Sequence, residues 1–262
     1  MHPPRYRTLS CAADDQGVVT IALSRPDARN AIDAQMRSDL AHAFHHAAEY
    51  GRAILLTGAG DSFCAGQDMG EGRNLRELDL GRTLREEYTP LLKEMRDVPL
   101  PVVAAVNGDA AGAGMHLALH CDVVFAAESA LFMEAAGQLG LIPDVGGSWW
   151  LPRLVGPARA MGMALFSEPI RAETAESWGL IWRAVPDAEL LSRAHARAAQ
   201  LANGPREGFV AMRHAMREAM ESTLGAQLET EARMQAELGR SRDFKEAVLA
   251  LGENRAPEFE GR

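Results

Sequence analysis

The stretch "LPVVAAVNGDAAGAGMHLALHCD", residues 100–122, joins an apolar run to a helical pattern through a turn rich in glycine and alanine. Short apolar, β-branched runs that end in turn residues are typical of buried strands. Glycine in such a turn lets the main chain approach a ligand closely, and the following helix presents unpaired N–H groups with a partial positive charge. The stretch therefore predicts a buried strand, an anion-binding turn and a helix, in that order.

Two more apolar runs upstream, residues 18–23 and 53–58, have the same character and are also predicted to be buried strands. Residues 33–50 lie between them and repeat apolar side chains every three or four positions, with Asp33 placed as an N-cap. This spacing predicts an amphipathic helix. Strands that alternate with helices imply an α/β layout.

The last third of the chain changes character, because long helical patterns follow residue 190 with few strand signals. We therefore predict a core, residues 1–190, that holds the active site, and a helical C-terminal region, residues 191–262. The apolar and methionine-rich stripes of these helices are consistent with intramolecular packing and also with a subunit interface.

Composition narrows the class of protein. The net charge of −9 argues against an extended nucleic-acid surface, which needs a clustered basic face. No apolar run reaches the roughly 18 residues of a membrane span, and no targeting signal is visible. The three cysteines, Cys11, Cys64 and Cys121, are odd in number and far apart, which suits a reducing compartment. We expect a cytoplasmic protein that binds neither nucleic acid nor membrane.

A second glycine-containing turn, "TGAGDSFCAGQDM" at residues 57–69, follows the second apolar run. Two N–H groups that converge from separate loops make an oxyanion hole, which can stabilise the enolate of a thioester. The turn lacks the Gly-Lys-Ser/Thr ending of a P-loop, and the turn at residues 107–122 lacks the third glycine of a dinucleotide fingerprint. Each loop alone is equally consistent with a plain tight turn.

Four blocks together resemble the enoyl-CoA hydratase/isomerase (crotonase) superfamily in order and spacing: "SFCAGQDM", "NGDAAGAGMHLALHCDVVFAAESALF", "GLIPDVGGSWWLPRLVGPARAMGMAL" and "AESWGLIWRAV". The resemblance covers residues 15–262. It implies a ClpP/crotonase-like spiral of ββα units, followed by a helical region that mediates trimerisation, commonly as a dimer of trimers. Within the superfamily, the blocks "FCAGQD", "IPDVGG" and "AESWGLIW" and the C-terminal stretch are most similar to the ring 1,2-epoxyphenylacetyl-CoA isomerases of bacterial phenylacetate degradation.

The resemblance also implies site residues. The thioester oxygen of an acyl-CoA substrate would lie between the backbone amides of Gln67 and Ala113. Further contacts to substrate and coenzyme A would come from Arg25, Arg29, Ala65, Gly66, Asp68, Gly112 and Gly114. Coenzyme A is then part of the substrate, and the resemblance implies no cofactor and no metal.

The choice of chemistry depends on the acids. Hydratases of this family use two glutamates, but His116 and Ala136 stand at those two positions here. Isomerase-like members instead place an acid where this chain has Asp144, and apolar walls would raise the pKa of such a base. From its local sequence alone, Asp144 is equally consistent with a turn or cap aspartate. The nearby Glu134 is expected to be a structural or surface acid.

Apolar residues near Asp144 are candidates for the walls of the site: Leu139, Leu141, Ile142, Val145, Trp149 and Trp150. The resemblance also suggests that residues 70–96 shape the acyl pocket. Within them Tyr88, Leu92 and Met95 share helical spacing, which fits a pocket lining and core packing equally well.

His116 precedes His120 by four residues, a spacing that binds metal only if a third ligand joins them. A hydrogen-bonded helix residue behind the pocket, or an auxiliary proton-handling role, are the other interpretations. The leading hypothesis is an acyl-CoA isomerase with Asp144 as its base. The alternatives are a hydratase or hydrolase in which His116 helps to activate water, and a catalytically inactive acyl-CoA-binding protein.

Overall fold

The computed structural model describes residues 3–70 and 79–261, and its α/β core contains two β-sheets. The larger sheet has six strands in the order β1-β2-β3-β5-β7-β10, and only β1 and β2 pair antiparallel within it. Its strands are β1 (Leu9–Ala13), β2 (Val18–Leu23), β3 (Ala53–Gly58), β5 (Val102–Val106), β7 (Val123–Ala127) and β10 (Arg183–Val185). The three apolar runs of the sequence are thus strands, as predicted.

The smaller sheet has four strands in the order β4-β6-β8-β9. They are β4 (Ser62–Cys64), β6 (Asp109–Ala111), β8 (Leu131–Met133) and β9 (Ile170–Arg171). Successive pairs along the chain, β3/β4, β5/β6 and β7/β8, each give one strand to each sheet. This alternation is the spiral that the family resemblance implies, and its second turn places α4 (Ala113–Leu119) directly after β6.

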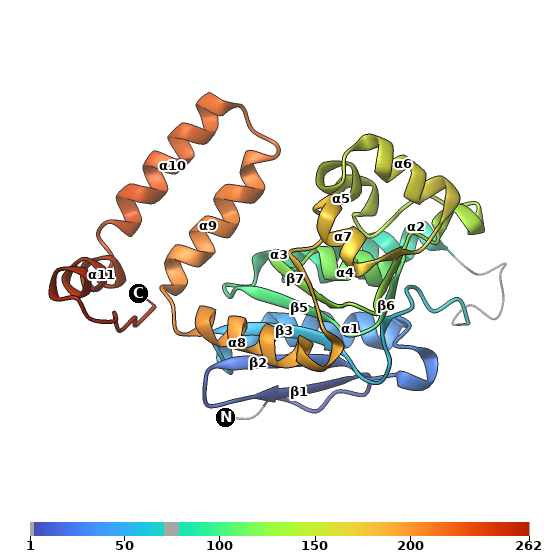
Figure 1. The fold of residues 1–262 in the computed structure, drawn as a ribbon, viewed down its shortest axis with the longest axis horizontal. Helices are drawn as coiled ribbons and strands as arrows, with labels where there is room; N and C mark the ends of the chain where they lie inside the picture. Colours follow the sequence, from blue (N-terminus) through green and yellow to red (C-terminus); the bar gives the residue numbers. More distant parts are fainter. Residues whose placement is uncertain (1–2, 71–78, 262) are drawn as a thin grey trace.

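Helices cover the sheets on both sides (Figure 1). The side chain of Asp33 accepts the N–H of Met36 at 2.8 Å and caps α1 (Ala34–His46), as the sequence predicts. The other helices of this body are α2 (Leu80–Thr83), α3 (Thr89–Asp97), α5 (Gly147–Leu154), α6 (Pro157–Phe166), α7 (Ala172–Trp178) and α8 (Leu190–Ala202). Short 3-10 turns occupy Pro26–Ala28, Ala47–Glu49, Ala136–Leu139 and Asp187–Glu189, and a π-helical turn, η3, occupies Leu84–Tyr88.

The predicted helical C-terminal region divides into two parts. Its first helix, α8, packs against β2, β3, β5 and β7 and therefore belongs to the body. The remaining helices, α9 (Arg206–Ala219), α10 (Leu224–Leu238) and α11 (Arg242–Glu253), project from the body as an arm (Figure 1). Of residues 70–96, which we expect to shape the acyl pocket, residues 71–78 lie outside the described part of the chain.

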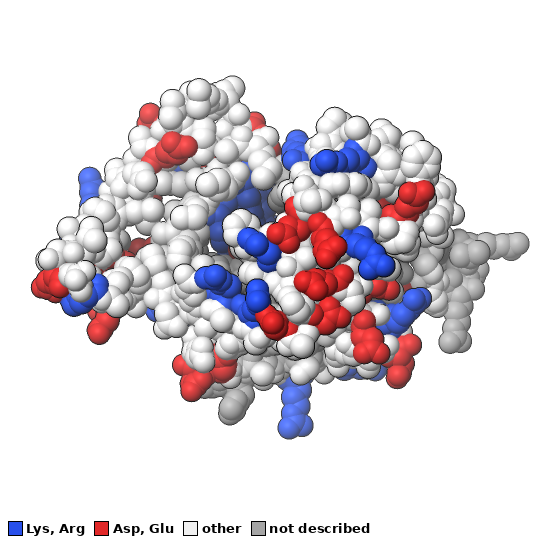
Figure 2. All heavy atoms as spheres, in the orientation of Figure 1, with Lys and Arg blue, Asp and Glu red and all other residues white. Residues whose placement is uncertain are grey.

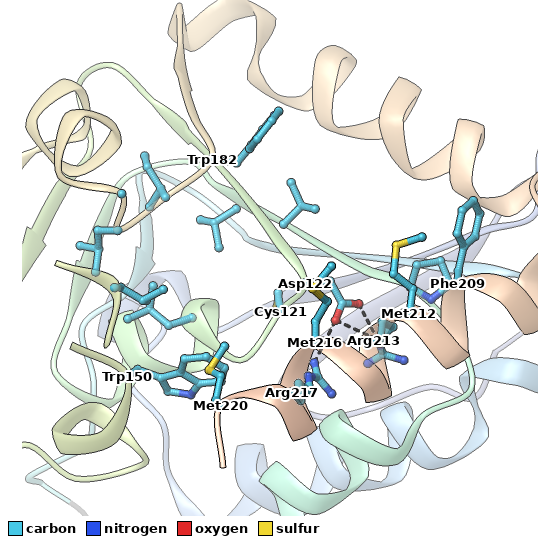
Figure 3. A pocket seen from close by; sticks show the side chains of 18 of the residues that line it. Cys121, Asp122, Trp150, Trp182, Phe209, Met212, Arg213, Met216, Arg217 and Met220 are labelled. Atoms are coloured by element: carbon cyan, nitrogen blue, oxygen red, sulfur yellow. Dashed lines mark hydrogen bonds and ion pairs between the residues drawn. The ribbon is translucent and has the colours of Figure 1, made fainter. Parts of the chain in front are cut away.

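A partly buried ionic cluster anchors the arm to the sheet (Figure 3). Asp122 lies directly before β7 and accepts from Arg213 at 2.8 Å and from Arg217 at 2.9 Å, both on α9. Asp122 also accepts the N–H of Val102 at 2.8 Å, which ties the cluster to β5. The first arm helix is therefore anchored to the parallel strands by hydrogen-bonded charges.

The surface differs between body and arm. Charged side chains of both signs are interspersed over the body, whereas the arm shows fewer of them in the same view (Figure 2). Large apolar side chains exposed on the arm are Met212, Met216, Met220, Leu224, Leu228, Phe244, Val248, Leu249 and Leu251. In the described part of the chain, no helix combines the length and the apolarity that crossing a bilayer requires.

Candidate active site

The two glycine-containing turns of the sequence meet in space. Gly66 has a φ of +93°, and a Cβ added there would lie 2.7 Å from the carbonyl oxygen of Ala111 and 3.6 Å from the amide nitrogen of Ala113. No side chain fits at that distance, so only glycine allows the loop after β4 to touch the turn before α4. Two predicted contributors to the site, Gly66 and Ala113, are therefore neighbours.

The amide of Gln67 is directed away from its neighbouring segment. A parallel bridge joins Gln67 to Ile32: Ile32 donates to the carbonyl of Gly66 at 2.8 Å, and Asp68 donates to the carbonyl of Ile32 at 3.0 Å. Peptide groups alternate in direction along an extended segment, so the N–H of Gln67 points to the opposite side. It has no partner among the described residues.

The amide of Ala113 is the first of α4. Gly112, with a φ of 47°, precedes it as the N-cap, and the N–H of His116 is the first to bond back, to the carbonyl of Gly112 at 3.0 Å. The N–H of Ala113 is therefore one of the unpaired donors of a helix start. Two free amides from separate loops lie close together, an arrangement that can bind a developing oxyanion.

Tyr88, at the end of η3, supports this arrangement from a buried position. Its hydroxyl donates to the side-chain oxygen of Gln67 at 2.6 Å, and the residue is 2% exposed. Burial raises the pKa of Tyr88 above its ordinary value, so the phenol stays protonated as a donor. Helical spacing alone left Tyr88 open between pocket and core, and only the fold shows that it reaches Gln67.

Asp144 lies half-buried in the turn between the 3-10 turn Ala136–Leu139 and α5. Its carbonyl accepts the N–H of Gly147 at 2.7 Å, which closes the turn. Burial raises the pKa of the Asp144 carboxyl, a positive charge on His116 opposes the rise, and the negative charge on Glu134 adds to it. Asp144 also acts electrostatically on Tyr88, which contacts Gln67. The carboxylate therefore lies within electrostatic reach of the residues that surround the two amides.

His116 is fully buried and lies against Glu134, its Nε2 being 2.7 Å from Oε2 of the glutamate. This position agrees with the interpretation of His116 as a residue behind the pocket. Its neighbour there is the carboxylate of Glu134. Glu134 is only 1% exposed, so a surface location for this residue is wrong. A sequence pattern does not reveal the pairing, because residues 116 and 134 come from different turns of the spiral.

His120 holds the neighbouring residues of the same turn. Its Nε2 lies 3.1 Å from the carbonyl of Val145, and burial lowers the pKa of the imidazole to about 4, so the ring is neutral and donates this bond. Val145 has a φ of 47°, which is rare for a β-branched residue and marks a strained turn. In the described part of the chain no third metal-binding side chain joins His116 and His120.

The predicted coenzyme A contacts fall into two groups. Arg25 is held by Asp68 at 2.9 Å and by Asp33 at 3.1 Å, so the structure pairs two of the predicted contacts with each other. Arg29 is exposed, and its carbonyl accepts the N–H of Ala65 at 2.9 Å. Its guanidinium has no partner among the described residues, which leaves it available to an anion.

Some of the remaining predicted residues are packed inside the protein and others are exposed. Gly114 packs so closely on Cys64 that a Cβ there would lie 2.6 Å from the cysteine sulfur, which fixes α4 against β4. Trp149 and Trp150 stack edge to face beside the Asp144 turn, as expected for walls. Leu139, Leu141 and Ile142 are 56%, 41% and 75% exposed, so within one chain they do not wall the site.

Two cavities flank α5. One, of about 430 Å³, reaches from Gly146 and His120 to Leu92 on α3. Leu92 thus lines a cavity, whereas Met95 is buried in the core. The other, of about 580 Å³, lies between the body and α9 and is lined by Trp182 and a methionine row on the arm (Figure 3).

Comparisons with known proteins show which family and fold the chain shares. A family model described as "Enoyl-CoA hydratase/isomerase" matches residues 13–262. A "Probable enoyl-CoA hydratase" of Rhodobacter capsulatus is 54% identical, over 94% of this chain and 96% of its own length. The "1,2-epoxyphenylacetyl-CoA isomerase" of Escherichia coli is 43% identical, over 95% of this chain and 97% of its own. The crystal structure of an enoyl-CoA hydratase from Mycobacterium smegmatis has a TM-score of 0.90 at 30% identity, with 96% of this chain and 98% of that chain covered.

Proposed function

The chain belongs to the enoyl-CoA hydratase/isomerase family, and we propose that within it the chain is an acyl-CoA isomerase with Asp144 as its single base. The Asp144 carboxylate takes a proton from the carbon next to the thioester carbonyl. The amides of Gln67 and Ala113 stabilise the negative charge that this develops on the thioester oxygen. Asp144 then returns the proton two carbons along the chain, so the reaction consumes no water and needs no cofactor.

The position of the acids carries this proposal. A hydratase pair needs two carboxylates facing the substrate, but residue 136 is alanine and residue 116 is histidine. Glu134, the nearest further acid, is buried against His116. Asp144 remains as the half-buried carboxyl with a pKa that burial raises, which makes it a better proton acceptor than an exposed aspartate.

For the substrate we propose 2-(1,2-epoxy-1,2-dihydrophenyl)acetyl-CoA, converted to oxepin-CoA, with a Δ3–Δ2 double-bond shift in enoyl-CoA as a related activity. The 43% identity to the Escherichia coli 1,2-epoxyphenylacetyl-CoA isomerase supports the first. The same carboxylate and amides serve the double-bond shift, since that reaction also passes through an enolate.

Asp144→Asn tests the assignment of the base, because the variant keeps the shape and loses the proton acceptor. We expect turnover of ring-epoxide and 3-enoyl-CoA substrates to fall by a factor of about 10²–10⁴ while acyl-CoA binding persists, as loss of a general base typically costs that much. Retained activity with both substrates would refute the assignment. A parent protein that binds acyl-CoA but turns over no substrate would instead support an inactive, acyl-CoA-binding protein.

Hydration is the second candidate function, and the 54% identity to a relative named as a probable enoyl-CoA hydratase favours it. His116 would then activate water. With 2-enoyl-CoA in ¹⁸O-labelled water, a hydratase forms a labelled 3-hydroxyacyl product. An isomerase converts its substrate without incorporating solvent oxygen, so this measurement separates the two.

We also propose that the chain assembles as a homotrimer or as a dimer of trimers, in the cytoplasm. The apolar side chains exposed on the arm and the exposed Leu139, Leu141 and Ile142 support an assembly that covers them. The three cysteines are free thiols, which suits a reducing compartment. Sedimentation velocity of the full chain measures the mass of the assembly directly.

A further inference from the structure

Two buried acid–base side chains, His116 and Glu134, lie behind the turn that carries Asp144, and the proposed mechanism gives them no step. Their exposures are 0% and 1%. Nε2 of His116 lies 2.7 Å from Oε2 of Glu134, and Oε1 of Glu134 accepts the N–H of Ala136 at 3.0 Å. The carboxylate is thus fixed on one side by the backbone and on the other by the imidazole.

Packing alone does not explain these residue types. Nδ1 of His116 has no hydrogen-bond partner among the described residues, and the Nε2–Oε2 contact has the distance of an ion pair without the alignment of a hydrogen bond. Buried polar atoms without hydrogen bonds are destabilising. A buried ion pair is commonly no more stable than apolar side chains of the same volume. Another role has to account for the pair.

The pair is connected to Asp144 through the backbone. The imidazole of His116 lies so close to Gly147 that a Cβ there would be 2.3 Å from Nε2. The N–H of Gly147 donates to the carbonyl of Asp144 at 2.7 Å. The position of the ring therefore limits where the turn, and with it the carboxylate, can lie.

The pair is also connected to Asp144 through charge. A positive His116 lowers the pKa of Asp144, against the rise that burial causes, and a negative Glu134 raises it. Two other titratable groups face this region, Tyr88 from η3 and His120 from α4. Both are neutral at pH 7, because burial raises the pKa of the phenol and lowers that of the imidazole to about 4.

The cations that act on Tyr88 and His120 have partners of their own. Arg37, which lies 5.2 Å over the Tyr88 ring, is paired with Glu87 at 2.7 Å. Arg217, which acts on His120, is paired with Asp122 at 2.9 Å. Of the described groups that act on Asp144, His116 is therefore the one that can supply a positive charge.

We propose that His116 is a positioning residue for Asp144: its ring, which lies against Glu134, fixes the turn that carries the Asp144 carboxylate, and the pair sets the charge around this base. The inference rests on the proposed function of Asp144. In this inference His116 and Glu134 act on Asp144 and do not activate water, as a hydratase would require.

The first test needs no substrate. In protein labelled with ¹³C at aspartate carboxyls, the Asp144 signal is identified by its absence in Asp144→Asn and is then titrated. We expect His116→Gln to raise the midpoint by about one pH unit, as loss of an opposite charge nearby typically does. The matched control is His45→Gln, whose histidine pairs with Glu94 at 2.9 Å on the surface and which should leave the midpoint unchanged. An unchanged midpoint in folded His116→Gln overturns the inference.

The second test concerns Glu134. Should His116→Gln leave an unpaired carboxylate and fail to fold, the double variant His116→Gln/Glu134→Gln removes both charges. It should still raise the Asp144 midpoint, by a smaller amount, because the loss of the negative charge offsets part of the rise.

Kinetics separate the inference from the proposed function. In His116→Gln the acid limb of kcat/KM should move upward with the Asp144 midpoint, while KM changes less than about threefold and activity recovers at higher pH. A loss of activity that is independent of pH points to a merely structural role and contradicts the inference. If Asp144→Asn stays active, the proposed function fails, while the titrations still decide whether His116 acts on Asp144. If Asp144→Asn is inactive and the midpoint does not move in His116→Gln, the inference alone fails.

Discussion

The imidazole ring of His116 occupies the space that a side chain at Gly147 would need. A Cβ on Gly147 would lie 2.2 Å from Cε1 of the ring, well inside van der Waals contact. The two residues come from different helices, α4 and α5, which bracket the turn of Asp144. This contact makes the glycine after "PDVG" a packing requirement, in addition to its place in a turn.

Gly147→Ala should therefore destabilise the fold and displace the Asp144 turn. Overpacking of this kind costs about 1–3 kcal/mol, and we expect kcat/KM to fall along with the urea midpoint. The matched control is Gly162→Ala on α6, where an added Cβ meets no atom within 4 Å. Helix propensity predicts that the control gains about 0.5–1 kcal/mol. Equal stabilities of the two variants would contradict the packing that we describe.

Ala113→Pro should remove one oxyanion donor without unfolding α4. Ala113 is the first residue of the helix, where proline is tolerated because that N–H has no helical partner. Losing one such donor typically costs a factor of about 10²–10³ in kcat. The control is Leu224→Pro, at the first position of α10, 77% exposed on the arm. Circular dichroism should show both variants folded, and full activity of Ala113→Pro would rule out this amide as a donor.

Asp144→Asn should stabilise the protein at neutral pH. The raised pKa of Asp144 means that its carboxyl binds a proton more tightly in the folded than in the unfolded state. Its contribution to stability is then fully present below the unfolded pKa and is lost as the pH rises through the folded pKa. Asparagine does not titrate, so Asp144→Asn should have a higher free energy of unfolding in urea than the parent at pH 7. The difference should narrow as the pH falls below the folded pKa. Asp15→Asn, at an exposed position, should show no such trend.

Asp122→Ala should loosen the arm from the body. The change leaves Arg213 and Arg217 without their shared carboxylate, and because the cluster is only partly buried we expect a cost below the roughly 3–5 kcal/mol of a fully buried pair. The control is Glu86→Ala, which removes an exposed partner of Arg82 and should cost no more than about 0.5 kcal/mol. Hydrogen exchange of α9 should rise in Asp122→Ala, and unchanged exchange would show that the ionic cluster does not anchor the helix.

Local patterns were sufficient to predict three central strands and some of the helices. The apolar runs at residues 18–23, 53–58 and 100–108 contain strands, because nearly every side chain in a covered parallel sheet is buried. The Asp33 cap also followed from local sequence, since a cap acts within one helical turn. The spiral itself depends on which strands pair, and the resemblance of four ordered blocks supplied that order.

The site was only partly predictable, because it depends on contacts between segments that are far apart in the chain. Gln67 and Ala113 follow from family blocks, but their closeness depends on Gly66 touching the turn before α4. The ion pair of His116 with Glu134 joins residues 18 positions apart on adjacent turns of the spiral, and no sequence period connects them. Ile142 was predicted to be a wall residue but is exposed. Hydrophobicity alone does not tell whether a side chain faces the site or the surface.

Helix α4 connects the amide of Ala113 to the turn that carries Asp144. Its first residue carries the amide of Ala113, and one and two turns later His116 and His120 hold the two sides of the Asp144 turn. An α-helix lengthens by about 1.5 Å per residue and hardly stretches, so in the proposed reaction the residue count of this helix would set the distance between the thioester oxygen and the Asp144 base. Substitutions in the walls would then change which acyl groups enter, while the carbon atoms between which the proton moves would stay the same.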